Sequence, residues 1–204
     1  MNASPPNAAQ VIEELRAGNA RFRKAHSIHP HATAARLHDL PPGQHPNAAV
    51  LSCSDSRVPV ELLFDSGFGD LFVIRNAGNT CTAGSLASVE YAVEALNVPL
   101  LLVMGHSGCG AVGAACTPSH QLTPSLMSYV GHIHRDLERA GLHFDDANDR
   151  ERACGLNAQL AARELIRASE LLQERLKQGQ LEVHAACFEL ENLEVRWLGP
   201  QGVA

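Results

Sequence analysis

Two short segments of the chain carry side chains that could bind a metal ion. The first is CSDSR at residues 53–57, in which a thiol, a carboxylate and a guanidinium occupy alternate positions. The second is HSGC at residues 106–109, in which an imidazole and a thiol stand three residues apart. Two thiolates, one imidazole and one carboxylate form a plausible tetrahedral set for zinc. The two segments therefore predict one metal site if the fold brings them together.

Both segments also have simpler interpretations. A lone cysteine at the end of a strand is usually a small buried hydrophobic side chain, and Asp55 and Arg57 could form a plain surface ion pair. The segment GHSGCGAV at residues 105–112 could bind a phosphate, because glycine-rich turns before a helix bind anions. It lacks the Lys-Ser/Thr end of a P-loop, which weakens the nucleotide interpretation.

Alternating strand and helix patterns surround these segments. Short apolar runs predict strands at 48–53, 70–76 and 98–106, and helical patterns follow them at 58–67, 85–97 and from 109 onward. Alternation at this spacing is typical of right-handed βαβ crossovers and a parallel sheet. Such sheets place their chemistry at the carboxyl ends of the strands. If the first and third strands are neighbours, the four ligand-type groups converge.

The rest of the chain predicts further helices and a closing hairpin. Residues 7–25 form an amphipathic pattern in which Gly18 is a candidate break; its apolar stripe is Val11, Ile12, Leu15 and Phe22. Residues 26–47 are rich in histidine and proline and predict an extended arm. Helical patterns follow at 123–141 and 150–178, and strands at 181–190 and 193–198 predict a hairpin at the sheet edge.

The predicted fold is a single α/β domain over residues 1–204. A chain of this length can bury one full core. We expect a mostly parallel central sheet, with about four parallel strands plus an antiparallel edge strand. Helices flank this sheet, and an extended N-terminal helix and arm precede it.

The composition argues against several classes of protein. A net charge of −6 and an aromatic content of 4% argue against a nucleic-acid partner. The longest apolar run, residues 98–104, is too short to span a bilayer, and the first ten residues show no signal-peptide pattern. The six cysteines include no C-x-x-C pair, which disfavours a redox dithiol. We therefore expect a cytoplasmic protein without a membrane partner.

The paired motifs CSDSR and GHSGCGAV, in this order, resemble those of the β-class carbonic anhydrases. The resemblance covers most of the chain, including LRAGNARF at 15–22, GQHP at 43–46 and long segments at 52–79 and 84–112. It implies one Zn²⁺ per subunit, bound by Cys53, His106 and Cys109. The reaction it implies is the reversible hydration of CO₂ to bicarbonate and a proton, by hydroxide that the zinc supplies.

The resemblance also implies roles for residues around the metal. Asp55 either takes the fourth position on zinc, which closes the site, or is held aside by Arg57, which lets water enter. In the family, low pH favours the closed form. Gln44 matches a pocket position with an amide donor, and Val58 and Phe72 would be apolar walls for a small gas. Phe72 could equally be ordinary core.

Some implications concern assembly and regulation. In the family the N-terminal helix embraces a second subunit, so residues 1–47 predict a subunit contact in a homodimer or homotetramer. Some bacterial members have an inhibitory bicarbonate pocket with a tryptophan where this chain has Val50. Arg75 matches the arginine of that pocket, but without the tryptophan we do not expect this regulation.

Two other functions fit the same residues. One is hydrolysis of carbonyl sulfide or carbon disulfide, which are linear molecules related to CO₂. The other is a non-catalytic zinc-binding module in which Asp55 permanently completes the ligand set. The presence of Arg57 argues against the module, because a purely structural site needs no residue to pull a ligand away.

Overall fold

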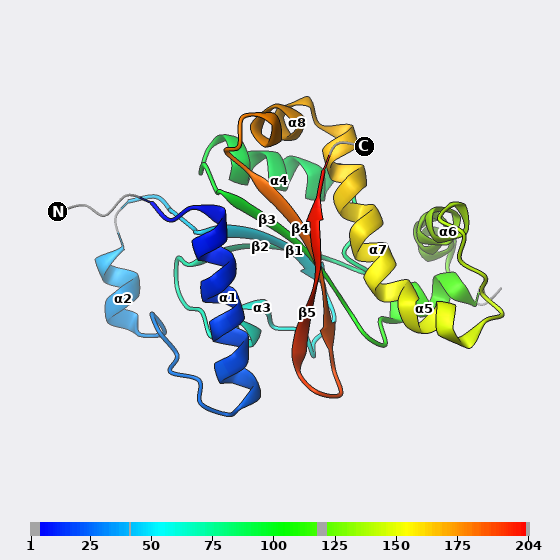
Figure 1. Ribbon diagram of the computed structural model, residues 1–204, viewed down its shortest axis with the longest axis horizontal. Coiled ribbons are helices and arrows are strands. Elements are labelled where there is room, and N and C mark those ends of the chain that lie inside the picture. Colours follow the sequence, from blue (N-terminus) through cyan, green and yellow to red (C-terminus); the bar gives the residue numbers. More distant parts are fainter. Residues whose placement is uncertain (1–4, 41, 118–121, 203–204) are drawn as a thin grey trace.

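A five-stranded sheet lies at the centre of the protein (Figure 1). The computed structural model describes residues 5–40, 42–117 and 122–202, without the side chains of 150 and 151. The strands, in spatial order, are β2 (Leu71–Asn76), β1 (Ala48–Cys53), β3 (Leu100–His106), β4 (Glu182–Glu189) and β5 (Glu194–Gln201). The first four are parallel, and β5 pairs antiparallel with β4 at the edge. The predicted fold class is confirmed.

Strands β1 and β3 are neighbours, with Ala49 opposite Leu101 and Ser52 opposite Met104. Every residue of both strands is buried. This explains their continuous apolar runs, since a central parallel strand is covered on both faces. Because the two strands run in the same direction, their carboxyl ends, which carry Cys53 and His106, lie at one edge of the sheet.

Helices cover both faces of the sheet (Figure 1). On one face, α1 (Ala8–Arg23) and α3 (Val60–Leu63) share a core with the even-numbered residues of β1 and β3. On the other face, the odd-numbered residues pack against α4 (Ala83–Glu94), α7 (Ala147–Ala168) and α8 (Glu170–Lys177). A third cluster includes Cys53 and residues of α5 (Gly110–Cys116), α6 (Pro124–Arg139) and α7. Within the described ranges, we find no helix long and apolar enough to cross a membrane.

Helix α1 packs on the core of its own chain. Val11 and Leu15 of the predicted stripe are buried there, and Ile12 and Phe22 are partly buried against the same cluster. Gly18 does not break the helix; instead it permits close packing, because a β-carbon there would lie 1.9 Å from the carbonyl oxygen of Phe64. The contact of residues 1–47 with a second subunit stays a prediction.

Three predicted elements had the wrong extent. Only Val60–Leu63 of the segment 58–67 is helical, and Asp65 soon after it adopts a left-handed backbone with φ of 48°. The arm at 26–47 is not wholly extended, since it contains α2 (Ala34–Asp39), which buries no residue. The predicted helix at 150–178 is two helices, because Ser169 has an extended backbone and its side chain accepts a hydrogen bond from the Leu172 N–H to cap α8.

The buried carboxylate of Asp65 fastens the arm to α1. It accepts hydrogen bonds from Arg21 Nε at 2.6 Å and from the backbone N–H groups of Ile28 and His29 at 3.1 and 2.9 Å. Burial alone would raise the pKa of this carboxyl group. The Arg21 bond and the two backbone bonds outweigh burial, so its pKa lies below the ordinary value.

We expect Asp65→Asn to destabilise the fold by about 2 kcal/mol at neutral pH. This loss is smaller than that expected for a fully buried ion pair, because one-third of the Arg21 side chain is exposed to solvent. Asparagine also tolerates the left-handed backbone, so the substitution removes mainly the charge. A lowered folded-state pKa stabilises above the unfolded pKa, and this contribution is lost as the pH falls through the folded one. Urea unfolding at neutral and acidic pH measures this. The exposed Asp39→Asn is the control, and an equal loss in both variants would contradict the assignment.

Candidate metal centre

The fold brings three of the predicted ligands together. Cys53 is the last residue of β1, His106 is the last of β3, and Cys109 is the N-cap of α5. Gly108, just before Cys109, has φ of 66°, a conformation that suits glycine and turns the chain from strand to helix. The three side chains are buried, and their ligand atoms all lie within 4.8 Å of one another. Among the described residues this is the group with metal-ligand geometry.

The spacing of the sulfur atoms fits a tetrahedral zinc ion. The distance between Cys53 Sγ and Cys109 Sγ is 3.8 Å. Two sulfurs that are each about 2.3 Å from zinc at a tetrahedral angle are about 3.8 Å apart. The donor set of two thiols and one imidazole is also one that zinc prefers among the common divalent metals.

The ring of His106 is oriented for metal binding. It is fully buried, and Nδ1 lies 3.0 Å from the Ser107 carbonyl oxygen, so Nδ1 carries the proton that this oxygen accepts. The lone pair of Nε2 then faces the two thiols, and Nε2 has no hydrogen-bond partner among the described residues. A buried polar atom without a partner is costly. A metal ion at this point would satisfy it.

The two thiols of the site share one hydrogen bond, and this bond shifts their pKa values in opposite directions. The hydrogen bond from Cys109 lowers the pKa of Cys53; burial opposes this change, and the bond from the Gly78 N–H reinforces it. The same hydrogen bond, together with burial, raises the pKa of Cys109. The shared hydrogen bond thus favours ionisation of Cys53 over that of Cys109, and a bound cation would favour loss of both protons.

Asp55 is paired with Arg57 and lies outside the three-ligand group. Its Oδ1 accepts hydrogen bonds from Arg57 Nε at 3.0 Å and from the Arg57 backbone N–H at 2.9 Å, and its Oδ2 accepts one from Nη2 at 2.8 Å. These bonds, from the side chain first and then the backbone, hold the pKa of Asp55 well below its usual range. Oδ2 also lies 3.8 Å from His106 Nε2. An ionised carboxylate thus stands beside the metal position without occupying it.

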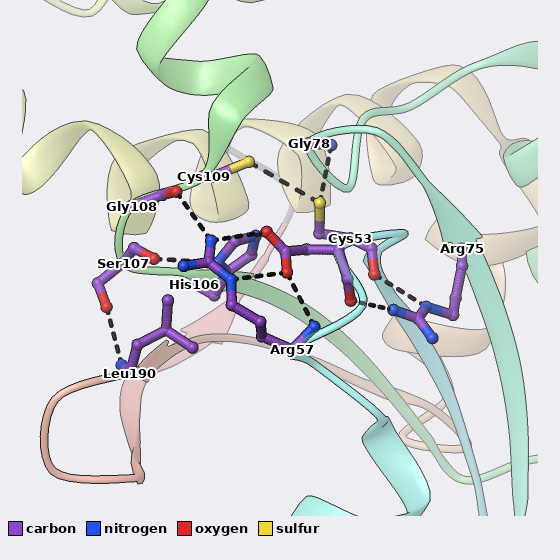
Figure 2. A network of polar contacts seen from close by, with 10 residues as sticks. Cys53, Arg57, Arg75, Gly78, His106, Ser107, Gly108, Cys109 and Leu190 are labelled. Atoms are coloured by element: carbon purple, nitrogen blue, oxygen red, sulfur yellow. Dashed lines mark hydrogen bonds and ion pairs between the residues drawn. The ribbon is translucent and has the colours of Figure 1, made fainter.

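Arg57 also links the two motifs. Its Nη2 donates to the carbonyl oxygen of Gly108 over 3.4 Å, as Figure 2 shows. Gly108 precedes the ligand Cys109 in the chain. The guanidinium therefore contacts the first motif through Asp55 and the second through Gly108.

Arg75 is a site residue that the sequence did not place at the metal centre. Its Nε donates to the Cys53 carbonyl oxygen at 2.9 Å, and its Nη2 donates to the Asp55 carbonyl oxygen at 2.6 Å (Figure 2). These two bonds fix the backbone between the thiol and the carboxylate. The available signal was one arginine within the otherwise apolar run of β2, paired in register with Ser52.

The three predicted pocket residues have different surroundings in the single chain. Val58 is fully buried three residues after Asp55, and its N–H donates to the Asp55 carbonyl oxygen at 3.0 Å. On β2, Asn76 pairs with Cys53 of β1. Phe72 lies four strand positions before Asn76, so it is about 13 Å from the metal-site end of the strand. It packs against the core and the Tyr91 ring, and its role as a wall of the substrate pocket stays a prediction. Gln44 is exposed.

The other four cysteines lie outside the three-ligand group. Cys116, Cys154 and Cys187 are buried in the same apolar cluster as Cys53 and Cys109. Cys81 is half-buried, and burial raises its pKa to about 11. Neutral thiols of this kind behave as small apolar side chains.

Comparisons with known proteins point to one family. A family model described as carbonic anhydrase matches residues 48–195, which include both motifs. Carbonic anhydrase 2 of Mycobacterium tuberculosis is 34% identical over 202 residues, which cover 94% of this chain and 91% of the relative. This range of similarity extends beyond the site to nearly the whole chain.

Solved structures give the same result. The β-carbonic anhydrase CcaA superposes with a TM-score of 0.71 and 28% identity, covering 95% of this chain and 93% of that one. A structure from a study of two tetrameric β-carbonic anhydrases of Sordaria macrospora has a TM-score of 0.70 and 26% identity, covering 94% and 98%. With the Cys-His-Cys group at the end of the parallel strands, these matches show that the chain belongs to the β class of the carbonic anhydrase family.

Proposed function

We propose that this protein hydrates CO₂ reversibly at one Zn²⁺ per subunit, held by Cys53, His106 and Cys109. The observation that carries the proposal is the geometry of the four groups. Three buried ligand atoms lie within 4.8 Å of one another, while the carboxylate beside them is held by Arg57. A site with three protein ligands and a free fourth position is typical of catalytic rather than structural zinc.

Zinc bound here would act as a Lewis acid that makes water a nucleophile near neutral pH. Asp55 supplies the orientation. Its carboxylate accepts a hydrogen bond from the attacking water and aims the oxygen lone pair at the carbon of CO₂. A carboxylate does this only when ionised, and the bonds from Arg57 favour that form. The oxygen adds to the carbon, the product is bicarbonate, and the released proton leaves to solvent or buffer.

The gate between open and closed forms consists of Asp55 and Arg57. When Arg57 holds both carboxylate oxygens, Asp55 would leave the fourth position of a bound zinc to water. If Asp55 turned away from Arg57, its Oδ2, already 3.8 Å from His106 Nε2, would need only a small movement to reach a metal bound by that nitrogen. The Arg57 fork thus favours the open form, which supports an enzyme over a non-catalytic module.

The proposal includes a homodimer or homotetramer in which residues 1–47 contact a second subunit. The similar Sordaria macrospora proteins are described as tetrameric. In this chain, Leu37 of α2 is 54% exposed, and a contact with a second subunit would cover it. In the proposed assembly, Gln44, which is exposed in the single chain, faces the substrate pocket.

The test is turnover of CO₂ by purified protein of known zinc content. Stopped-flow hydration should show rates proportional to bound zinc, while carbonyl sulfide, assayed side by side, should turn over far more slowly. Faster turnover of carbonyl sulfide would favour the hydrolase alternative. Stoichiometric zinc without activity on either gas, at mildly acidic and alkaline pH, would favour the non-catalytic module.

A further inference from the structure

The Cys53 thiol has a hydrogen-bond donor in a loop that carries no metal ligand. The backbone N–H of Gly78 donates to Cys53 Sγ over 3.3 Å (Figure 2). An N–H···S bond withdraws electron density from a thiolate and restricts the direction in which the sulfur can point. Groups that hydrogen-bond to a metal ligand in this way tune its affinity for the metal. The Gly78 N–H is therefore part of the hydrogen-bonding environment of the metal centre.

The loop at 76–80 is tightly held around Gly78. The Asn76 side chain bridges the loop, accepting from the Thr80 N–H and donating to the Thr80 carbonyl oxygen, both at 2.9 Å. Gly78 itself is buried with φ of 74°. A β-carbon there would lie 3.1 Å from Ile133 Cδ1 and 3.2 Å from Ala111 Cβ. A side chain at this position would therefore be crowded, so glycine suits both the backbone conformation and the space.

Asn157 of α7 is an anchor of this loop from across the site. Its Nδ2 donates to the Gly78 carbonyl oxygen over 2.8 Å, although the two residues are 79 positions apart. The side chain is buried, with 4% of its surface exposed. A buried amide is costly unless its hydrogen bonds hold something in place. Gly78 is thus fixed on one side by Asn157, while its N–H faces Cys53 on the other.

We infer that Asn157 is a positioning residue for the zinc ligand Cys53. It acts through Gly78 by holding the N–H against the sulfur, which keeps Cys53 Sγ in the place where it meets His106 and Cys109. The inference rests on the proposed function, because it assumes that Cys53 binds zinc. Removing the Asn157 amide should then weaken zinc binding and change the metal–sulfur bond, beyond any effect on folding.

The experiment compares two buried asparagines. Asn157→Leu keeps the approximate volume and removes the donor. Asn19→Leu is the matched control: Asn19 is 5% exposed and makes three backbone hydrogen bonds, to Leu63, Leu193 and Val195, on the opposite face of the sheet. Zinc affinity is measured by competition with a chelator. The sulfur-to-metal charge-transfer absorption is measured on the cobalt-substituted proteins.

We expect Asn157→Leu to weaken zinc binding about tenfold or more and to shift the charge-transfer band. Asn19→Leu should lower the stability of the fold but leave zinc affinity and the band as in wild type. If leucine prevents folding, the smaller Asn157→Ser serves the same comparison. Wild-type values in the Asn157 variant, or equal changes in both variants, would overturn the inference. A wild-type protein that binds no zinc would instead overturn the proposed function.

Discussion

Replacing Cys53, His106 or Cys109 with alanine should abolish zinc binding and CO₂ hydration together. Each residue supplies one of the three ligand atoms that lie within 4.8 Å of one another, and two ligands cannot hold zinc tightly against water. Without the metal, the rate should fall to that of the uncatalysed reaction, a loss of about a millionfold or more. Metal analysis of the purified variants and stopped-flow hydration measure the two effects.

Cys187→Ala is the matched control for these variants. Cys187 is a buried thiol of the same apolar cluster, with 1% of its surface exposed, but it lies outside the three-ligand group. Its replacement should leave stoichiometric zinc and near wild-type turnover. Circular dichroism establishes that each variant is folded. A Cys53, His106 or Cys109 variant that kept one zinc per subunit and full activity would show that the ligand set is wrong.

Arg57→Ala should reduce kcat/KM about 10- to 100-fold, the range typical of groups that orient a metal site. The carboxylate of Asp55 would lose its fork and could turn to the metal, closing the fourth position to water. Arg57→Lys should be intermediate, because an ammonium group cannot form two parallel hydrogen bonds to a carboxylate. In the cobalt-substituted protein, the absorption spectrum should report the added oxygen ligand.

The pH dependence of kcat/KM in the Arg57→Ala variant shows whether Arg57 acts by orienting Asp55 or by keeping it ionised. Arg57 lowers the pKa of Asp55, so its removal should let that pKa rise toward the ordinary value of about 4. Asp55 would still be ionised above about pH 5, so the defect should persist from about pH 6 to about pH 9. The control is Arg196→Ala, which removes an exposed arginine paired with Glu189 at 3.0 Å. Wild-type kcat/KM in the Arg57 variant would contradict the gate.

The Cys-His-Cys group and the sheet could be predicted because their signals are local. Cys53 and His106 end apolar runs whose burial on both faces requires a central position, and the crossover rule brings such ends to one edge. Spacing alone did not reveal that β1 and β3 are adjacent. That followed only from the resemblance and from the pairing seen in the structure.

The parts that escaped prediction depend on contacts between distant segments. Nothing near Asn157 indicates that its amide would meet Gly78, 79 residues away. Arg75 was visible as a charged residue in an apolar strand, but its two backbone acceptors belong to another strand end. Gly18 resembled a helix breaker in the local sequence pattern. Its actual role is to let α1 pack closely against the backbone of Phe64, which the local pattern does not show.

The separation of the two cysteine ligands along the chain affects how stable the protein is against degradation. Cys53 and Cys109 are 56 residues apart, and both are buried beneath α5 and α7. A cation bound by both cysteines closes a long loop. Like a covalent crosslink, it lowers the conformational entropy of the unfolded chain and so stabilises the fold. Depletion of zinc in a cell would therefore inactivate the enzyme and also make the chain easier for proteases to cleave. The amount of the protein in the cell should then decrease when zinc is scarce.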